Sequence, residues 1–143
     1  KGNLYNDLKK LLEKYSFDPK NLNIEVTEEG IMKNPKKSIE ILNKIRDLGI
    51  KINIDDFGTG YSSLTYLKKL PISKLKIDRN FIKDIPEDKD DMVITKTIIS
   101  LAKNLNLKLI AEGVETEKQQ EFIFQNGCEY IQGYLYSKPL PID

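Results

Sequence analysis

Residues 50–63 read IKINIDDFGTGYSS, and this stretch decides the fold. An apolar strand over residues 50–56 ends on the adjacent carboxylates Asp55 and Asp56. It then runs into a loop with two glycines and four hydroxyl side chains. Oxygen ligands suit Mg²⁺ or Mn²⁺, and glycines let the backbone come close to a bound phosphate. The same pattern fits an ordinary turn followed by a helix cap, and both interpretations stay open at this point.

Strand and helix patterns alternate along the chain on both sides of this stretch. The pattern predicts five strands, at residues 21–26, 50–56, 74–78, 108–112 and 130–134. Helical spacing predicts four apolar helix faces, formed by Leu4, Leu8, Leu11, Leu12 and Tyr15; by Ile41, Leu42, Ile45 and Leu48; by Leu64, Leu67 and Leu70; and by Val93, Ile94, Ile98, Leu101, Ala102 and Leu105. Repeated strand-helix units with short loops predict an α/β fold with a parallel sheet, either open or closed into a barrel.

Helix boundaries are marked by capping residues. Asn34-Pro35 predicts a helix start, and Gly49 predicts its end. Thr116 to Gln119 is a capping-box pattern that opens a further helix, which ends before Gly127.

The predicted strands alternate apolar and polar residues instead of running continuously apolar. Leu75 and Ile77 flank Lys76, for example, and Ile52 and Ile54 flank Asn53. With a period of two, each strand turns its apolar side to the helices and its polar side to a common interior. Buried charges are costly unless they pair or bind an ion, and active sites of (β/α) barrels lie at the carboxyl ends of the strands. A functional cluster is therefore expected there, with a purely structural salt-bridge network as the alternative.

Size and composition limit the possible chemistry. The 143 residues fit one domain, and the charge is balanced at 23 basic against 22 acidic residues, so no polybasic face predicts a nucleic-acid duplex or a membrane surface as partner. Histidine is absent, which excludes histidine-ligated metals and Ser-His-Asp triads within this chain. The single cysteine, Cys128, excludes an intrachain disulfide. No apolar run reaches the roughly 20 residues of a membrane span, and no signal peptide is visible, so we expect an internal piece of a cytoplasmic protein, one that could still be membrane-anchored through segments outside this chain.

Five ordered motifs in this chain resemble the EAL family of cyclic-di-GMP phosphodiesterases. They cover nearly the whole chain from about Asn21 onward. The motifs are Ile24-Glu25-Val26-Thr27-Glu28, Asp55-Asp56-Phe57-Gly58-Thr59-Gly60-Tyr61-Ser62-Ser63, Lys76-Ile77-Asp78-Arg79, Ala111-Glu112-Gly113-Val114-Glu115 and Gln132-Gly133-Tyr134.

The resemblance implies a (β/α)₈ barrel of TIM type with one antiparallel strand. It also implies hydrolysis of cyclic di-GMP to linear pGpG with Mg²⁺ or Mn²⁺. A full barrel needs roughly 250 residues, and only about five strand-helix units are visible here. The Glu-Ala-Leu signature and an upstream strand with a metal-binding asparagine are absent. We therefore expect residues 1–143 to be the C-terminal portion of a single EAL-type barrel without an internal domain boundary. We expect such a fragment to be weak or inactive alone.

The resemblance assigns metal-binding roles to three carboxylates. Glu25 and Asp56 correspond to metal ligands, and Asp55 corresponds to an aspartate shared between two metals. Paired cations about 3.5–4 Å apart need such bridging and flanking carboxylates. The alternative for Glu25 is a strand carboxylate paired with Lys76 or Lys51.

The remaining catalytic positions are also filled. By resemblance, Lys76 points at the metal-bound water and the phosphate, and Glu112 matches the proposed general base for the attacking water. Gln132 matches a glutamine that contacts substrate or ordered water. The alternatives are an internal ion pair of Lys76 with Asp55 or Asp78, a ligand or cap role for Glu112, and a structural hydrogen bond for Gln132.

Four further residues are expected around the site. Glu28 and Glu115 match glutamates that brace the loop from Phe57 to Ser63, although both also precede helices, whose N-termini favour acids. Asp78 is expected as a wall of the site, and Tyr134 as packing or as a stacking surface for guanine.

Two classes of function remain open for the whole protein. One is a two-metal cyclic-di-GMP phosphodiesterase; the other is a catalytically degenerate receptor that binds cyclic di-GMP without hydrolysing it. The expected partner is cyclic di-GMP in either case, and GGDEF-type or sensory domains are expected elsewhere in such a protein. Unpaired strand edges also predict that this chain forms a homodimer or a swapped oligomer.

Overall fold

The computed structural model describes residues 3–60 and 64–141 and contains a five-stranded parallel sheet. The strands are β1 (Asn23–Thr27), β2 (Lys51–Phe57), β3 (Lys74–Ile77), β4 (Lys108–Glu112) and β5 (Tyr130–Gln132). Their order in the sheet is their order in the chain, and all four pairings are parallel. The predicted α/β class and parallel sheet are thus confirmed.

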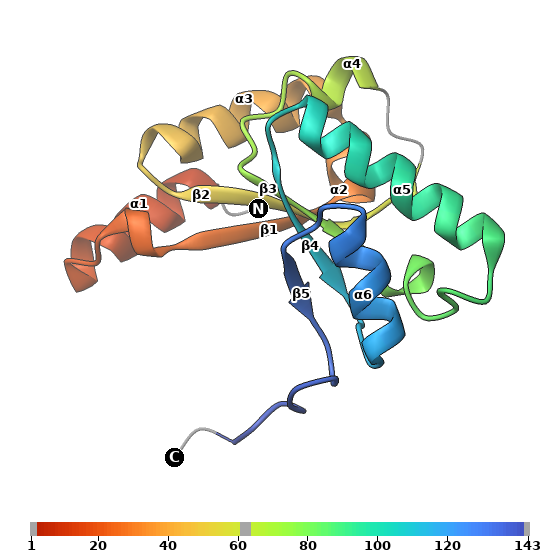
Figure 1. Cartoon of the computed structure of the whole chain (residues 1–143). Coiled ribbons are helices and arrows are strands. Elements are labelled where there is room, and N and C mark those ends of the chain that lie inside the picture. Colours follow the sequence, from red (N-terminus) through yellow and green to blue (C-terminus); the bar gives the residue numbers. More distant parts are fainter. Residues whose placement is uncertain (1–2, 61–63, 142–143) are drawn as a thin grey trace.

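One helix precedes β1, and the others connect successive strands. They are α1 (Leu4–Tyr15), α2 (Glu28–Met32), α3 (Pro35–Asp47), α4 (Leu64–Leu67), α5 (Lys89–Asn104) and α6 (Glu117–Gln125), with short 3₁₀ turns at Pro19–Asn21 and Arg79–Phe81. Parallel crossovers are almost always right-handed, so sequential strand order places the connecting helices on one face of the sheet. Figure 1 shows α3, α5 and α6 along the twisted strands, while the chain after β5 runs away from the sheet. No described helix is long and apolar enough to cross a membrane.

The predicted helix caps are present. The Asn34 side chain accepts a hydrogen bond from the Lys37 amide at 3.3 Å, with Pro35 in the first turn of α3. At α6, the side chain of Thr116 accepts from the Gln119 amide, and the side chain of Gln119 accepts from the Thr116 amide. These local signals alone set the two helix starts, because each satisfies amides that the helix leaves without partners.

The core lies between the helix-facing side of the sheet and the helices. Strand residues Ile52, Ile54, Leu75 and Ile77 are at most 1% exposed, as the alternation predicted. Helix residues that close over them include Leu42, Ile45, Ile98, Ala102 and Ile123. The polar residues between the strand anchors are therefore turned to the other face of the sheet.

The predicted face of α5 was partly wrong. Val93 is 63% exposed and Ile94 is 38% exposed, whereas Thr95 is fully buried. Thr95 lies on the buried face of α5 with Ile98 and Ala102, and its hydroxyl donates to the Phe81 carbonyl at 3.0 Å. A buried hydroxyl with a backbone partner displaces apolar residues that periodicity alone would bury.

Three further expectations need correction. The first strand begins at Asn23 instead of Asn21, because residues 19–21 form a 3₁₀ turn. The last strand ends at Gln132, before Tyr134. The apolar stripe of α1 is only partly buried: Leu8 and Leu12 pack against the core, whereas Leu11 is 51% exposed and Tyr15 is 65% exposed.

Gly133 fixes the path of the chain after β5. A Cβ added at Gly133 would lie 2.1 Å from the Val114 carbonyl oxygen and 2.4 Å from its nitrogen. Val114 in turn donates to the Gln132 carbonyl, and its own carbonyl accepts from the Leu135 amide, each at 3.1 Å. The segment after β5 is therefore tied to the loop after β4 by a close backbone contact that only glycine permits.

We expect Gly133→Ala to lower the free energy of unfolding by about 1–3 kcal/mol, because the methyl group forces the two backbones apart. Urea unfolding followed by circular dichroism measures the change. Ser137→Ala, at an exposed position in the same segment, serves as the control and should have little effect. Equal stability of Gly133→Ala and wild type would contradict the close contact.

Candidate active site at the carboxyl ends of the strands

Charged side chains from neighbouring strands meet at one edge of the sheet. Glu25 comes from β1, Asp55 and Asp56 from β2, Lys76 from β3 and Glu112 from β4. Parallel strands bring their carboxyl ends to the same edge, so residues far apart in sequence become neighbours there. The structure thus brings together the five predicted metal-binding and catalytic residues.

A β-bulge in β2 places two consecutive carboxylates in this site. Ile54 pairs with Leu75 and Phe57 pairs with Ile77, so Asp55 and Asp56 together lie opposite a single residue of β3. Asp56 has a positive φ of 53°, unusual for a residue other than glycine. In a regular strand, adjacent side chains point to opposite faces, and a bulge interrupts that alternation. Carboxylate oxygens of Asp55, Asp56 and Glu112 consequently lie within 4.8 Å of one another.

Lys76 is the centre of the charge network. Its Nζ lies 3.1 Å from Glu25 Oε2 and 3.2 Å from Asp55 Oδ1, and it contacts Glu112 Oε1. The Lys76 side chain is only 6% exposed. An ammonium has three N–H donors, and here carboxylates from three different strands are within reach of them. The alternative pairings of Glu25 with Lys76 and of Lys76 with Asp55 are therefore both observed.

Burial and neighbouring charges shift the pKa values in this cluster. Burial would lower the pKa of Lys76, but the hydrogen bonds to Glu112, Glu25 and Asp55 outweigh it, and the pKa is raised. Burial raises the pKa of Glu112, and Lys76 only partly offsets that rise. The pKa of Asp56 is raised by burial and then by the charges of Asp55 and Asp78. Two acids with raised pKa values beside a lysine held in its charged form are typical of a catalytic cleft.

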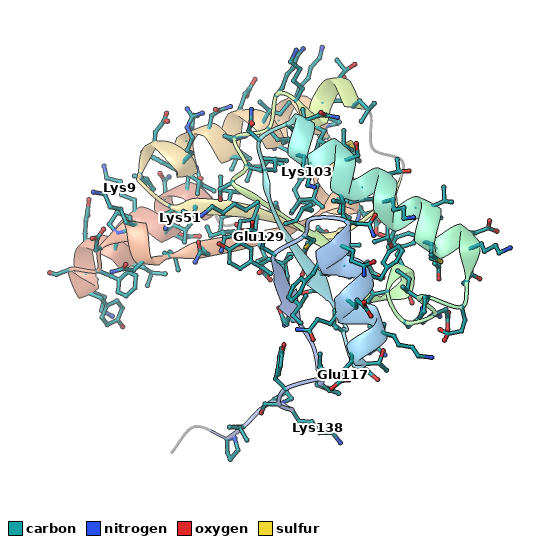
Figure 2. The ribbon with its side chains drawn as sticks, viewed as in Figure 1. Lys9, Lys51, Lys103, Glu117, Glu129 and Lys138 are labelled. Carbon is teal, nitrogen blue, oxygen red and sulfur yellow. The ribbon has the colours of Figure 1, made fainter. Side chains whose placement is uncertain are left out.

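A cavity of about 370 Å³ lies beside this cluster at the ends of β4 and β5. Its wall includes Arg79, Glu112, Glu115, Gln132, Tyr134 and Lys138. Figure 2 shows Lys138 on the segment that follows β5. Gln132 is exposed, and its main chain pairs beside Glu112. The polar lining suits part of an anionic, hydrogen-bonding ligand.

Three of these wall residues, Arg79, Ser137 and Lys138, were not among the predicted site residues. Arg79 is the last residue of the quoted Lys76-Ile77-Asp78-Arg79 motif, so its place in that motif was the available signal. Ser137 and Lys138 line the cavity because of the path that the chain takes after Gly133, and no local sequence pattern predicted that path.

The Asp78 carboxylate lies near Asp56 and is engaged by the backbone. Its carboxylate accepts from the Asn80 amide at 2.7 Å and caps the 3₁₀ turn after β3, and the side chain is nearly buried. Its charge also helps to raise the pKa of Asp56. The role of a supporting wall of the site stays a prediction for Asp78.

Glu28 braces the glycine loop. It is 1% exposed, and its Oε2 accepts hydrogen bonds from the Gly58 amide at 2.8 Å and the Gly60 amide at 3.4 Å. A carboxylate that accepts backbone amides forms strong, charge-assisted hydrogen bonds. The loop that follows Asp55 and Asp56 is thereby fixed to the start of α2. Residues 61–63 of the predicted loop lie outside the described part of the chain.

Glu115 lies elsewhere in the site. The residue lines the cavity with Arg79 and Gln132, and no hydrogen bond joins it to the described residues of the glycine loop. Bracing of the loop by Glu115 therefore stays a prediction.

The donor set fits a hard divalent cation. Asp55, Asp56 and Glu112 offer three carboxylate oxygens in one group, and oxygen is the ligand that Mg²⁺, Mn²⁺ and Ca²⁺ prefer. Glu25 lies outside this group and is paired with Lys76 instead. Glu112 belongs to this group of possible metal ligands, although the family resemblance assigned it the role of general base.

Comparison with known proteins identifies the family. The EAL domain family profile matches residues 1–139, and the chain therefore belongs to the EAL domain family. It is 47% identical over 142 residues to the cyclic di-GMP phosphodiesterase NbdA of Pseudomonas aeruginosa, covering 99% of this chain and 18% of NbdA. It is 48% identical over 140 residues to MucR of the same organism, a bifunctional diguanylate cyclase/cyclic di-GMP phosphodiesterase, covering 98% and 20%. The chain thus spans about a fifth of the length of these relatives.

Solved structures show the same fold. The MucR phosphodiesterase in complex with c-di-GMP superimposes with a TM-score of 0.93 at 48% identity, over 96% of this chain and 56% of that one. BlrP1 of Klebsiella pneumoniae in a manganese/cy-diGMP complex gives a TM-score of 0.84 at 30% identity, over 94% and 34%. The five-stranded sheet therefore matches the TIM-barrel-like structure of EAL domains.

We expect Glu28→Gln to loosen the glycine loop, because it replaces charge-assisted hydrogen bonds with neutral ones. The cost is about 1–2 kcal/mol. Hydrogen exchange at the Gly58 and Gly60 amides, read by NMR, should become faster. Glu29→Gln removes a neighbouring carboxylate that is exposed and should leave both amides protected. Unchanged exchange in Glu28→Gln would show that the brace does not hold the loop.

Proposed function

We propose that the protein containing this chain is a divalent-metal-dependent phosphodiesterase that hydrolyses cyclic di-GMP to linear pGpG. The observation that carries this proposal is the cluster of Asp55, Asp56, Glu112, Glu25 and Lys76 at the carboxyl ends of the strands. Membership of the EAL family supports it. Residues 1–143 then form the C-terminal portion of one (β/α)₈ barrel.

In this proposal Asp55, Asp56 and Glu25 would hold two Mg²⁺ or Mn²⁺ ions, in the ligand roles that the family resemblance gives them. Such ions, when bound, lower the pKa of water and neutralise charge on a phosphate. The bulge in β2 is what allows Asp55 and Asp56 to serve one site. Glu25 is paired with Lys76 at 3.1 Å, so its use as a ligand would require this ion pair to be exchanged for the cation.

Glu112 and Lys76 act on the reacting groups. The Glu112 carboxylate removes a proton from the attacking water, and its raised pKa brings it closer to the pKa of an effective base near neutral pH. Lys76 remains protonated because of its carboxylate partners and places a positive charge where the phosphate gains negative charge. Gln132 and the polar wall of the adjacent cavity contact the rest of the dinucleotide.

A receptor that binds cyclic di-GMP without turnover is the alternative. It requires loss of at least one catalytic group, and the positions visible in this chain are all filled by residues suited to catalysis. The enzyme is therefore the better-supported function.

The test is pGpG formation from cyclic di-GMP by the intact protein in Mg²⁺ or Mn²⁺. We expect Glu112→Gln to lower kcat about 10²–10⁴-fold, because the water loses its base. Glu129→Gln is the matched control, since this exposed glutamate directly precedes β5 at the amino end of the sheet (Figure 2). Chelation of the metal with EDTA should abolish turnover. Binding without turnover in the wild type would establish the receptor instead.

We also propose that the isolated chain self-associates. In the described sheet, β1 and β5 each have one neighbouring strand, which leaves backbone groups at both edges. Near the β1 edge, Leu11, Tyr15 and Phe17 are between 48% and 65% exposed, and they line one apolar groove. A second copy that covers this groove would remove that surface from water.

Light scattering after size-exclusion chromatography should therefore give a dimer or larger species for residues 1–143 at micromolar concentration. Leu11→Lys together with Phe17→Lys should shift it towards the monomer, while the exposed pair Lys36→Glu and Lys37→Glu on α3 should not. A monomer at all concentrations would contradict this proposal.

A further inference from the structure

The three carboxylates that contact Lys76 are the same groups that the proposed function gives to the metal ions and the water. Asp55 and Glu25 are proposed ligands, and Glu112 is the proposed base that also belongs to the metal-capable group. The ammonium of Lys76 therefore occupies oxygens that a divalent cation would need. One set of carboxylates serves two cations, one built into the chain and one from solution.

Without a cation, this arrangement of carboxylates is unfavourable. Glu25, Asp55 and Glu112 come from three different strands, and their like charges repel when held close together. Lys76 is the basic residue for which a salt bridge to these acids is observed in the described part of the chain. Its side chain is only 6% exposed, so the ammonium is largely shielded from water and its charge is balanced by these carboxylates.

We propose that the Lys76 ammonium is an internal counter-ion that holds the ligand carboxylates together in the metal-free protein and competes with the divalent cation for them. This inference rests on the proposed function, since it takes the same carboxylates as metal ligands. It makes Lys76 a positioning residue in the metal-free state, in addition to its role beside the phosphate.

The proposal makes two predictions of opposite sign for Lys76→Met, which keeps an unbranched side chain one atom shorter and removes its charge. The metal-free variant should melt at a lower temperature, because three carboxylates lose their counter-ion. The same variant should bind Mn²⁺ about tenfold more tightly or better, because no positive charge stands beside the ion or holds its ligands. Saturating Mn²⁺ should then raise the melting temperature more in the variant than in the wild type.

A purely structural role would not produce this pair of effects. If Lys76 only packed the site or oriented the ligands for the metal, its loss would lower stability and metal affinity together. Lys51→Met is the matched control: it removes the same charge from an exposed side chain at the start of β2, at the amino end of the sheet (Figure 2). It should change neither quantity.

The experiment is isothermal titration of the intact, metal-free protein with Mn²⁺, with calorimetric melting before and after. Tighter Mn²⁺ binding by Lys76→Met than by wild type supports the proposal. Equal or weaker binding by the folded variant, with wild type binding normally, overturns the counter-ion role and leaves the proposed phosphodiesterase intact. No Mn²⁺ binding by either protein overturns both.

A second measurement on the wild type needs no substitution and so covers a variant that fails to fold. With ¹⁵N-labelled lysine, the buried and hydrogen-bonded Nζ of Lys76 should give a slowly exchanging ammonium resonance in metal-free protein. Titration with Mg²⁺, which is diamagnetic, should shift that resonance or abolish it as the carboxylates turn to the ion. A resonance unchanged at saturating Mg²⁺ overturns the proposal.

Discussion

The ion pairs of Lys76 with Glu25, Asp55 and Glu112 join β1, β2 and β4 to β3 through side chains, at the edge where backbone pairing ends. Backbone hydrogen bonds hold neighbouring strands together, but they do not set the distances between carboxylates two or three strands apart. The buried ammonium of Lys76 sets these distances, because each of its short contacts holds one carboxylate close to the same nitrogen atom. Burial is essential here, since an exposed pair of this kind contributes little. Leu75 and Ile77, both fully buried, hold β3 in place so that Lys76 cannot retreat from its partners.

The bulge in β2 is the second constraint, and it explains why adjacent aspartates can serve one site. Asp55 Oδ1 accepts from the Asp56 amide at 3.1 Å, and Asp56 takes a positive φ of 53°. Strain of this kind costs on the order of 1 kcal/mol or more and persists only where surrounding contacts enforce it. Glu28 supplies one such contact, because it fixes the Gly58 amide directly beyond the bulge. The metal-capable group therefore depends on a residue of α2 that touches none of its carboxylates.

Much of this architecture could be predicted from the residues alone. Alternation in segments such as Leu75-Lys76-Ile77 predicted both the strands and the side of the sheet that carries the charges, because a period of two leaves no other arrangement. Capping residues predicted where α3 and α6 begin, since their hydrogen bonds are local. The bulge could not be predicted, because it depends on the register of β2 against β3. The burial of Thr95 on α5 was also hidden, since its hydroxyl bonds to the carbonyl of Phe81, outside the helix. The resemblance to a known family, more than periodicity, assigned individual roles to Glu25, Glu112 and Gln132.

The same strands carry both the buried core residues and the charged site residues, so a change in the core alters the site. Each charged group in the cluster lies next to an apolar anchor: Glu112 follows Ala111, which is fully buried, and Asp55 follows Ile54, which is 1% exposed. A shift of either anchor by a fraction of an ångström moves a carboxylate by the same amount, because the backbone between them is fixed in the sheet. The distances within the cluster are short enough that such a shift changes the interaction energies among the charges. Packing on the helix side of the sheet therefore affects the interaction energies among the charges on the opposite side, and a change on one face changes the other.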